Sequence, residues 1–376
     1  NDNEITDLDL STIPIKNISQ YKFANFTNIE SVILPTTLEE IGIYAFMNDS
    51  LITSISLPDG LKKINIGAFE KTSITSVNIP ASVEILGGFS YITALTSVTF
   101  NPNSSLNRIL VGCFRDTSIS SISIPQSCES LESYAFYNCS SLINFEFETN
   151  SKLNSFGQKV LYNTNVLSLK IPSCVKYIST DALSGSVIRD LEYPSVIEHY
   201  NLGLSYSTTV VKINSESLIE DAFLKVVNIT SLDLTDVTTY SKTAFSDGVM
   251  PSRYLRNCTI IVRSVEDYLN IETESDGYRI MFTNTIDGTT YYNYLKDSNG
   301  NYIEGIIDLS STTLTHIPAY AFYCYPTSHA ITKIILPTTM TSIEKYAFTS
   351  NFALKEIEVN SNLEIIDNRA FYNCSS

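Results

Sequence analysis

The sequence contains no tryptophan, only three histidines, and few charged residues, which make up 17% of the chain. The histidines (His199, His316 and His329) lie far apart, without metal-ligand spacing or the context of a catalytic nucleophile. Lys and Arg number 24 against 40 Asp and Glu, for a formal net charge of −16. That charge repels phosphate, so nucleic acid and anionic membranes are not expected as partners.

Long apolar runs are also missing, because none approaches the ~20 residues of a membrane-spanning helix, and we expect no direct membrane insertion. The seven cysteines form an odd set without paired C-x-x-C spacing, a poor framework for disulfides or zinc. Cys139 and Cys374 both occur in the phrase AFYNCSS. A residue that recurs at one point of a repeat is best explained as a small buried space-filler. We therefore predict no catalytic residue, no metal and no cofactor.

What the chain does contain is one phrase repeated every 20 to 25 residues. Its first half is an alternating segment that ends in proline, as in ITSISLP (52–58), ITSVNIP (74–80), ISSISIP (119–125) and ITKIILP (331–337). Its second half is an aliphatic residue four positions before Ala-Phe, as in Ile41 with Ala45-Phe46. Self-similarity at this period predicts a solenoid of about 14 repeats whose units must stack to bury a core.

Each half of the phrase predicts a part of one coil. The alternating half reads as a short strand with one face inward, and proline stops it because it has no N–H for another ladder bond. The recurring phenylalanine predicts a continuous buried row of stacked rings, with Leu161 and Leu183 in its place in the middle of the chain. We expect these aromatic residues to form core and not a ligand platform.

The repeat is interrupted between roughly 250 and 302, where Asp276-Gly277, Asp287-Gly288 and Asn299-Gly300 separate aromatic-rich runs. Asp-Gly and Asn-Gly turns between such runs are typical of β-hairpins. We therefore predict a first repeat array over 1–250, a β-rich insert or connector over 251–302, and a second array over 303–376. Because the last unit stops shortly after Ala370-Phe371, we expect the natural chain to continue past Ser376.

The complete unit, seen as ITSISLPDGLKKINIGAF at 52–69, resembles the BspA-like (Treponema-type) class of leucine-rich repeats. The resemblance implies a leucine-rich-repeat solenoid, a curved right-handed coil, mostly β with short helical turns, with the alternating strands on its concave side. It also implies a secreted or cell-surface protein of a host-associated microbe, often linked to adhesion, and it carries no catalytic residues to transfer.

Two groups of residues are candidates for partner binding. The first is a set of twelve outward positions on four successive strands, all of them Ser, Thr or Asn: Thr53, Ser54, Ser56, Thr75, Ser76, Asn78, Thr96, Ser97, Thr99, Ser120, Ser121 and Ser123. They could dock an extended polar partner, or they could simply be short β-compatible residues that tile a crowded face. The second group is the tyrosines of the insert, Tyr291, Tyr292 and Tyr294, which could anchor a partner or cover the end of an array.

Two functions remain open at this point. The chain could be a non-catalytic extracellular interaction scaffold that binds a protein or glycan at a cell surface. It could instead be a structural spacer that displays another domain. An enzyme is a distant third possibility, and the sequence does not indicate an oligomeric state.

Overall fold

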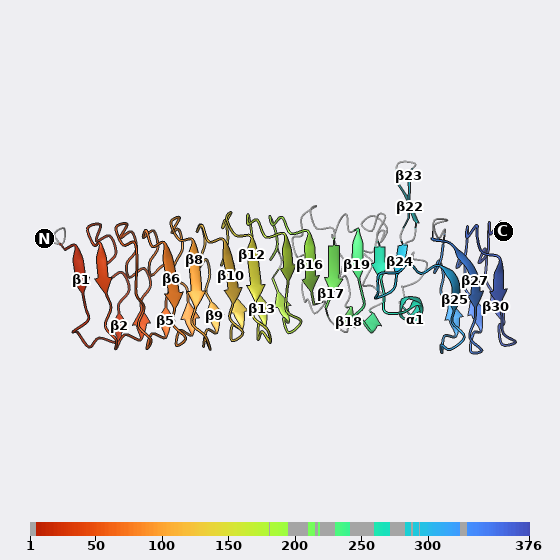
Figure 1. The fold of residues 1–376 in the computed structure, drawn as a ribbon, viewed down its shortest axis with the longest axis horizontal. Coiled ribbons are helices and arrows are strands. Elements are labelled where there is room, and N and C mark those ends of the chain that lie inside the picture. Colours follow the sequence, from red (N-terminus) through yellow and green to blue (C-terminus); the bar gives the residue numbers. More distant parts are fainter. Residues whose placement is uncertain are drawn as a thin grey trace. The chain divides into compact units, whose positions relative to one another are not determined.

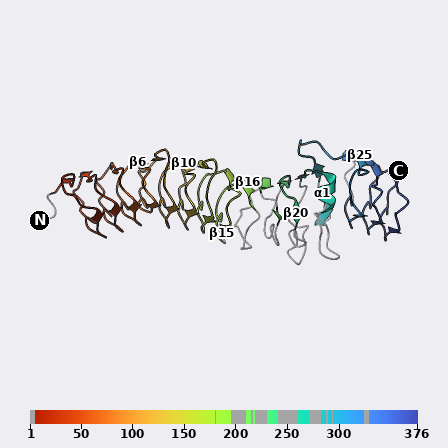
Figure 2. The same ribbon diagram turned by 90° about the horizontal axis from the view of Figure 1, so that it is seen from below.

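A computed structural model describes most of the chain, which divides into two compact units. Unit 1 comprises Asn1–Arg189 with Ile197–Ser205, and unit 2 comprises Asp190–Val196 with Tyr206–Ser376. The described residues are 5–179, 181–194, 210–214, 217–218, 230–240, 259–270, 283–286, 289–292, 294–323 and 329–376. In unit 1 the chain winds through successive similar coils (Figures 1 and 2).

The alternating segments of unit 1 form what we call the first ladder. Its strands are β1 (Asp7–Asp9), β3 (Ser31–Ile33), β6 (Ser76–Ile79), β8 (Ser97–Phe100), β10 (Ser121–Ile124), β12 (Asn144–Phe147) and β14 (Ser168–Lys170). β6 pairs in parallel with β8, and β10 pairs in parallel with β12. Inward residues such as Val77 and Ile122 are buried while their neighbours are exposed, as the period-two pattern predicts. Residues 52–58 contain no regular strand, although the N–H groups of Ser73 and Thr75 donate to the carbonyls of Ile52 and Thr53.

A second ladder, which the sequence did not suggest, runs along unit 1 beyond the proline turns. It is one eight-stranded parallel sheet of two-residue strands. They are β2 (Asn17–Ile18), β4 (Glu40–Ile41), β5 (Lys63–Ile64), β7 (Ile85–Leu86), β9 (Arg108–Ile109), β11 (Ser130–Leu131), β13 (Ser155–Phe156) and β15 (Tyr177–Ile178). In each strand the second residue is buried and the first is more exposed. The aliphatic residue four positions before Ala-Phe, such as Ile41, is the buried second residue of one of these strands.

The Ala-Phe segment closes a coil as an arc, which in most coils has two left-handed residues. One precedes alanine and the other follows phenylalanine by two positions, as at Tyr44 (φ 53°) and Asn48 (φ 66°) around Ala45-Phe46. Asn tolerates this backbone region better than other non-glycine residues, which explains why the phrase so often continues as Phe-x-Asn. Across the coils, the N–H of Phe46 donates to the carbonyl of Ala68 at 2.7 Å, so the arcs also form a backbone ladder.

The left-handed position gives a prediction in unit 2, where Ser350 has φ 59° at the place that asparagine occupies in other arcs. We expect Ser350→Asn to raise the free energy of unfolding by about 0.5–1 kcal/mol, because Asn adopts this conformation more easily. Ser350→Val should lower it by about 1–2 kcal/mol, because a β-branched residue is strained there. Urea denaturation of the two variants checks this, and shifts of the same sign for both would contradict the assignment.

The predicted row of phenylalanines is confirmed in the described part of both units. In unit 1 the rings of Phe46 and Phe69 stack with centroids 5.3 Å apart, and Phe69 and Phe89 follow at 5.4 Å. In unit 2 the centroids of Phe322 and Phe348 are 5.3 Å apart. All of these side chains are buried, so each ring contacts apolar neighbours on both sides and the row holds adjacent coils together.

In several coils the third residue after the phenylalanine of the row is a buried side chain that can form a hydrogen bond. Thr72 Oγ1 donates to the carbonyl of Phe69 at 2.9 Å, and Cys139 Sγ donates to the carbonyl of Phe114 at 3.0 Å. In unit 2 Asn351 Nδ2 donates to the carbonyls of Phe322 and Phe348. This third position therefore accepts side chains that can donate a hydrogen bond, which gives the cysteine of AFYNCSS the packing role predicted for it.

Unit 2 contains a further parallel sheet followed by a short pair of ladders. The sheet has β16 (Asp190–Tyr193), β17 (Val210–Ile213), β19 (Ser231–Asp233), β21 (Thr259–Ile261) and β24 (Tyr294–Lys296) in that order, and β18 (Ser217–Leu218) pairs with β20 (Thr239–Tyr240). Beyond them β25 (Gly305–Asp308), β27 (Ile331–Ile335) and β29 (Glu356–Glu358) form one ladder, and β26 (His316–Ile317), β28 (Ser342–Ile343) and β30 (Ile365–Ile366) form the other.

The segment between β21 and β24 contains a helix and a hairpin. Helix α1 (Val265–Leu269) begins at Ser264, whose side chain accepts a bond from the N–H of Asp267. Its buried Tyr268 donates a hydrogen bond to the carbonyl of Ala321 at 2.8 Å and places its ring 6.2 Å from that of Phe322. Tyr268 thus covers the first ring of the row in the final array. The hairpin pairs β22 (Thr283–Ile286) with β23 (Thr289–Tyr292) in antiparallel fashion.

Candidate functional site

The outer face of the first ladder in unit 1 carries the twelve predicted polar residues. All twelve are exposed, and those of β6 and β8 lie in register, Ser76 beside Ser97 and Asn78 beside Thr99. Some of them pair along the ladder: Thr99 Oγ1 donates to Asn78 Oδ1 at 3.0 Å, and Asn78 Nδ2 donates to Asn101 Oδ1 at 2.8 Å. The structure brings the set together on one surface, and these cross-coil bonds show that part of its hydrogen-bonding capacity is used internally.

Two exposed apolar side chains continue this face and were missed from the sequence. Ile143 is 57% exposed and Leu167 is 46% exposed. They occupy the position that Thr96 and Ser120 have in earlier coils, immediately before β12 and β14. Exposed apolar anchors within a polar rim are the usual arrangement of a protein interface. The polar face therefore has an apolar end formed by Ile143 and Leu167.

The tyrosines predicted in the insert fall on two strands. Tyr291 and Tyr292 belong to β23, where they pair with Asn284 and Thr283 of β22, and Tyr294 pairs with Thr259 of β21. Only the backbone of these three tyrosines is described, and their side chains lie outside the described part of the structure. Their role in binding stays a prediction.

Other tyrosines stack on the outside of the arcs. Tyr137 and Tyr162 have ring centroids 4.7 Å apart, and the guanidinium of Arg115 lies 4.8 Å from the ring of Tyr137 and 5.2 Å from that of Tyr91. Because the ring faces contact neighbours in the next coil, they are not free to stack on a ligand. These tyrosines act first as contacts between coils.

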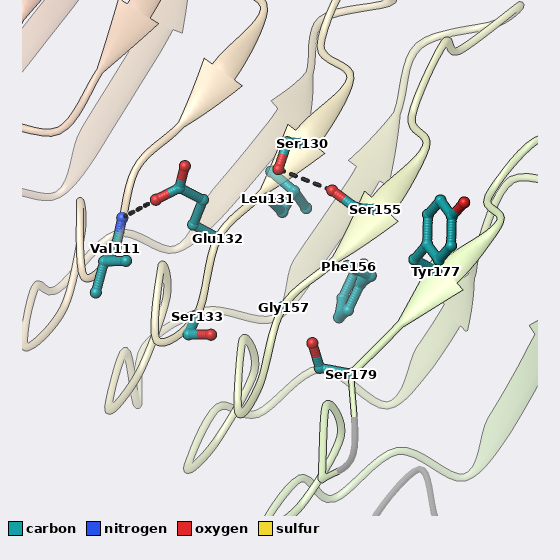
Figure 3. A pocket seen from close by; sticks show the side chains of 10 residues that line it. All are labelled: Val111, Ser130, Leu131, Glu132, Ser133, Ser155, Phe156, Gly157, Tyr177 and Ser179. Carbon is teal, nitrogen blue, oxygen red and sulfur yellow. Dashed lines mark hydrogen bonds between the residues drawn. The ribbon is translucent and has the colours of Figure 1, made fainter. Parts of the chain in front are cut away.

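A groove lies on the second ladder, where it passes β11, β13 and β15. Its volume is about 330 Å³, and Figure 3 shows the ten residues that line it: Val111, Ser130, Leu131, Glu132, Ser133, Ser155, Phe156, Gly157, Tyr177 and Ser179. The groove exists because the first strand residue is serine in β11 and β13, whereas β4, β5 and β9 carry Glu40, Lys63 and Arg108 there. Short side chains in adjacent coils thus leave a hollow between Glu132 and Tyr177.

Hydrogen bonds hold the polar groups of the groove in place. Ser155 Oγ donates to Ser130 Oγ at 2.8 Å, and Glu132 Oε2 accepts from the N–H of Val111 at 3.1 Å (Figure 3). The other oxygen of Glu132 pairs with the guanidinium of Arg108. At Gly157 a Cβ would lie 2.4 Å from the backbone nitrogen of Ser133. The backbone of two coils therefore approaches closely at the floor, and a side chain there would force them apart.

Burial limits the reactivity of two cysteines in the described part of the chain. Burial raises the pKa of Cys128 to about 12 and that of Cys139 to about 11, so the thiolate needed for nucleophilic chemistry is scarce at neutral pH. His329 Nδ1 lies 2.8 Å from Glu304 Oε2, His316 lies near Glu344, and His199 falls outside the described residues. Within the described residues, no group of three His, Cys, Asp or Glu side chains is placed to hold a metal ion.

The repeats can be compared with known families now that their geometry is established. The family model of the BspA-type leucine-rich repeat region matches six copies, over residues 2–88, 87–189 and 301–376. The chain belongs to the BspA-type leucine-rich repeat family. The predicted leucine-rich-repeat solenoid is thereby confirmed.

Solved structures include similar chains at low identity. A leucine-rich repeat protein from Bacteroides ovatus is 19% identical, with 99% of this BspA-type chain and 77% of the other covered and a TM-score of 0.43. The pneumococcal vaccine antigen PcpA is 15% identical, with 94% and 85% covered and a TM-score of 0.39. A leucine-rich cell surface protein from Faecalibacterium prausnitzii is 20% identical, with 80% and 73% covered and a TM-score of 0.29. No curated protein matches the chain.

At two positions of the repeat, some coils of this BspA-type chain carry residues of a different type from those in its other coils. The apolar pair Ile143 and Leu167 replaces hydroxyl side chains on the first ladder, and the serines of β11 and β13 replace larger side chains on the second. Neither change is needed for stacking, because Ile143, Leu167, Ser130 and Ser155 all lie outside the buried core. Helices in the described part of the chain are too short to cross a bilayer.

Proposed function

We propose that this BspA-type chain is a non-enzymatic extracellular interaction scaffold, and that the outer face of the first ladder in unit 1 binds a protein partner on a host or neighbouring cell. Membership of a repeat family without catalytic residues supports the non-enzymatic part. The exposed pair Ile143 and Leu167, at the end of four coils of exposed Ser, Thr and Asn, is the observation that carries the binding part.

The chemistry of this face favours a protein over a charged polymer. The twelve polar side chains are neutral and short, so they can form the hydrated rim of an interface without large loss of side-chain entropy. Ile143 and Leu167 supply the apolar area that a partner can bury, at roughly 25 cal/mol per Å². At ~4.8 Å between coils, the six coils from Thr53 to Leu167 present a face about 24 Å long.

The proposal predicts a specific loss of binding. The purified chain is titrated against an array of extracellular matrix proteins and glycans, and we expect saturable binding to a protein. The double variant Ile143→Ser/Leu167→Ser should weaken that binding at least tenfold, about 1.4 kcal/mol. Its stability should change by less than about 0.5 kcal/mol, because both side chains are exposed and earlier coils already carry hydroxyl residues there.

The matched control is Ile66→Ser, since Ile66 is 37% exposed but lies beyond the second ladder. It should bind as well as the unchanged chain. If Ile66→Ser weakens binding as much as the double variant, the first-ladder face is not the site. An array without saturable binding would favour the spacer function, for which the internal hydrogen bonds of Asn78 and Thr99 are the supporting observation.

A further inference from the structure

The groove on the second ladder has the properties of a small-ligand site that is independent of the protein-binding face. It lies on β11, β13 and β15, whereas the polar face with Ile143 and Leu167 follows the first ladder. Its volume of about 330 Å³ lies at the lower end of the ~300–1,000 Å³ typical of ligand sites. A turn separates the two ladders in each of these coils, so a ligand in the groove does not compete with a partner on the first ladder.

The lining of the groove restricts the charge of its ligand. Glu132 is the only charged side chain among the ten lining residues, and its carboxylate is already paired with Arg108 and bonded to the N–H of Val111. A cation would find a carboxylate whose charge is balanced, and an anion would face a carboxylate without a lysine or arginine in the lining. The groove therefore suits a neutral ligand.

The polar groups of the lining require a ligand that both donates and accepts hydrogen bonds. Ser130, Ser133, Ser155 and Ser179 contribute hydroxyls, which can do either, and Glu132 is an acceptor. Ser130 already accepts from Ser155 at 2.8 Å, which leaves its own hydroxyl hydrogen available to donate outward. An apolar ligand would leave these groups without partners, which is unfavourable.

Tyr177 adds a flat apolar surface at one side of the groove. Its side chain projects from β15 beside the groove in Figure 3, and the residue is 47% exposed. Its phenol combines this apolar surface with a hydroxyl that can form a hydrogen bond. A ligand with hydroxyl groups around its edge and C–H groups on its face would satisfy the serines, Glu132 and Tyr177 together.

We propose that this groove binds a neutral sugar unit of a glycan, with its C–H face against Tyr177 and its hydroxyls bonded to Glu132 and to the serines of β11 and β13. The site is preorganised: Glu132 is fixed from two sides, and the backbone contact at Gly157 fixes the floor. A rigid site of this kind loses little entropy when it binds.

The test uses saturation-transfer NMR of the full chain with glucose, galactose, mannose and N-acetylglucosamine, followed by an array of neutral oligosaccharides. We expect binding of at least one neutral sugar. Tyr177→Ser should weaken it at least tenfold, and Ser155→Arg should abolish it by filling the groove. Both substitutions introduce a residue that neighbouring coils already carry at the same position, Ser130 and Arg108, so the fold should be retained.

Ser141→Arg is the matched control, because it makes the same change at an exposed position of unit 1 that belongs neither to the groove nor to the polar face of the first ladder. It should leave sugar binding unchanged. The proposal is overturned if no neutral sugar shows saturation transfer, if binding survives Ser155→Arg, or if only anionic sugars bind. Retention of protein binding by Tyr177→Ser would show that the two sites are separate, so either proposal can fail without the other.

Discussion

Replacing Phe69 by alanine should lower the free energy of unfolding of unit 1 by about 3–5 kcal/mol. Phe69 is fully buried, and its ring lies 5.3 Å from that of Phe46 and 5.4 Å from that of Phe89. Removal of the ring leaves a cavity that neither neighbour can fill, because each is held by its own coil. Urea denaturation measures the loss, and hydrogen exchange should show the faster exchange in the coils that contain Phe46 and Phe89.

Phe69→Leu is the matched control for this experiment. Leu161 and Leu183 occupy the same position in later coils and are fully buried, so the repeat already accommodates leucine. The loss should stay below about 1.5 kcal/mol. Equal losses for Ala and Leu would mean that ring stacking itself, and not the filled volume, holds the coils together.

The second large effect is expected at Asp49, a fully buried carboxyl group. It occupies the third position after Phe46, where other coils place a hydrogen-bond donor such as Thr72, Cys139 or Asn351. Its Oδ1 accepts from the N–H of Phe26 at 2.8 Å, and its Oδ2 has no partner among the described residues. Burial raises the pKa of Asp49 to about 7, although the N–H groups of Phe26 and Asn25 oppose the shift.

This shift makes the stability of unit 1 depend on pH. Between the unfolded pKa, about 3.9, and the folded pKa, about 7, the folded chain holds a proton that the unfolded chain has lost. The contribution of Asp49 is therefore fully present below about pH 4 and is lost as the pH rises through 7. Asp49→Asn keeps an acceptor for Phe26, adds a donor and removes the titration. We expect the variant to be more stable by about 1–3 kcal/mol at pH 8, with the difference shrinking toward pH 4.

Urea denaturation of both proteins from pH 4 to pH 9 measures this difference. Asp59→Asn is the control, because Asp59 is an exposed aspartate in the next coil, and it should not reproduce the gain in stability of Asp49→Asn at pH 8. A pH-independent difference between the unchanged chain and Asp49→Asn would show that the carboxyl group does not titrate in this range.

The core of each coil could be predicted because its signal is repeated at a fixed distance. Phe46, Phe69 and Phe348 recur at one point of the phrase, and stacking follows from that recurrence. The outward positions of β6 and β10 followed equally directly, since apolar Val77 and Ile122 alternate with polar neighbours. In these cases a local pattern and the tertiary packing require the same residue.

The second ladder could not be predicted because its strands are too short to alternate. Lys63-Ile64 has two residues, and its strand character comes only from pairing with Glu40-Ile41 and Ile85-Leu86 in adjacent coils. The groove was missed for the same reason, since Ser130 and Ser155 become neighbours only when these coils are aligned. Ile143 was missed because it follows another aliphatic residue, Leu142, and only alignment with Leu95-Thr96 and Ile119-Ser120 shows that it points outward.

The direction of the bonds between coils determines how unit 1 should respond to a pulling force. The hydrogen bonds of both ladders and of the arcs connect one coil to the next. Tension along the stack of coils therefore breaks the bonds between one pair of coils before those between the next. Each detached coil of 20 to 25 residues would release about 70–80 Å of extended chain. A protein built in this way would lengthen in steps under load and re-form coil by coil when the load falls.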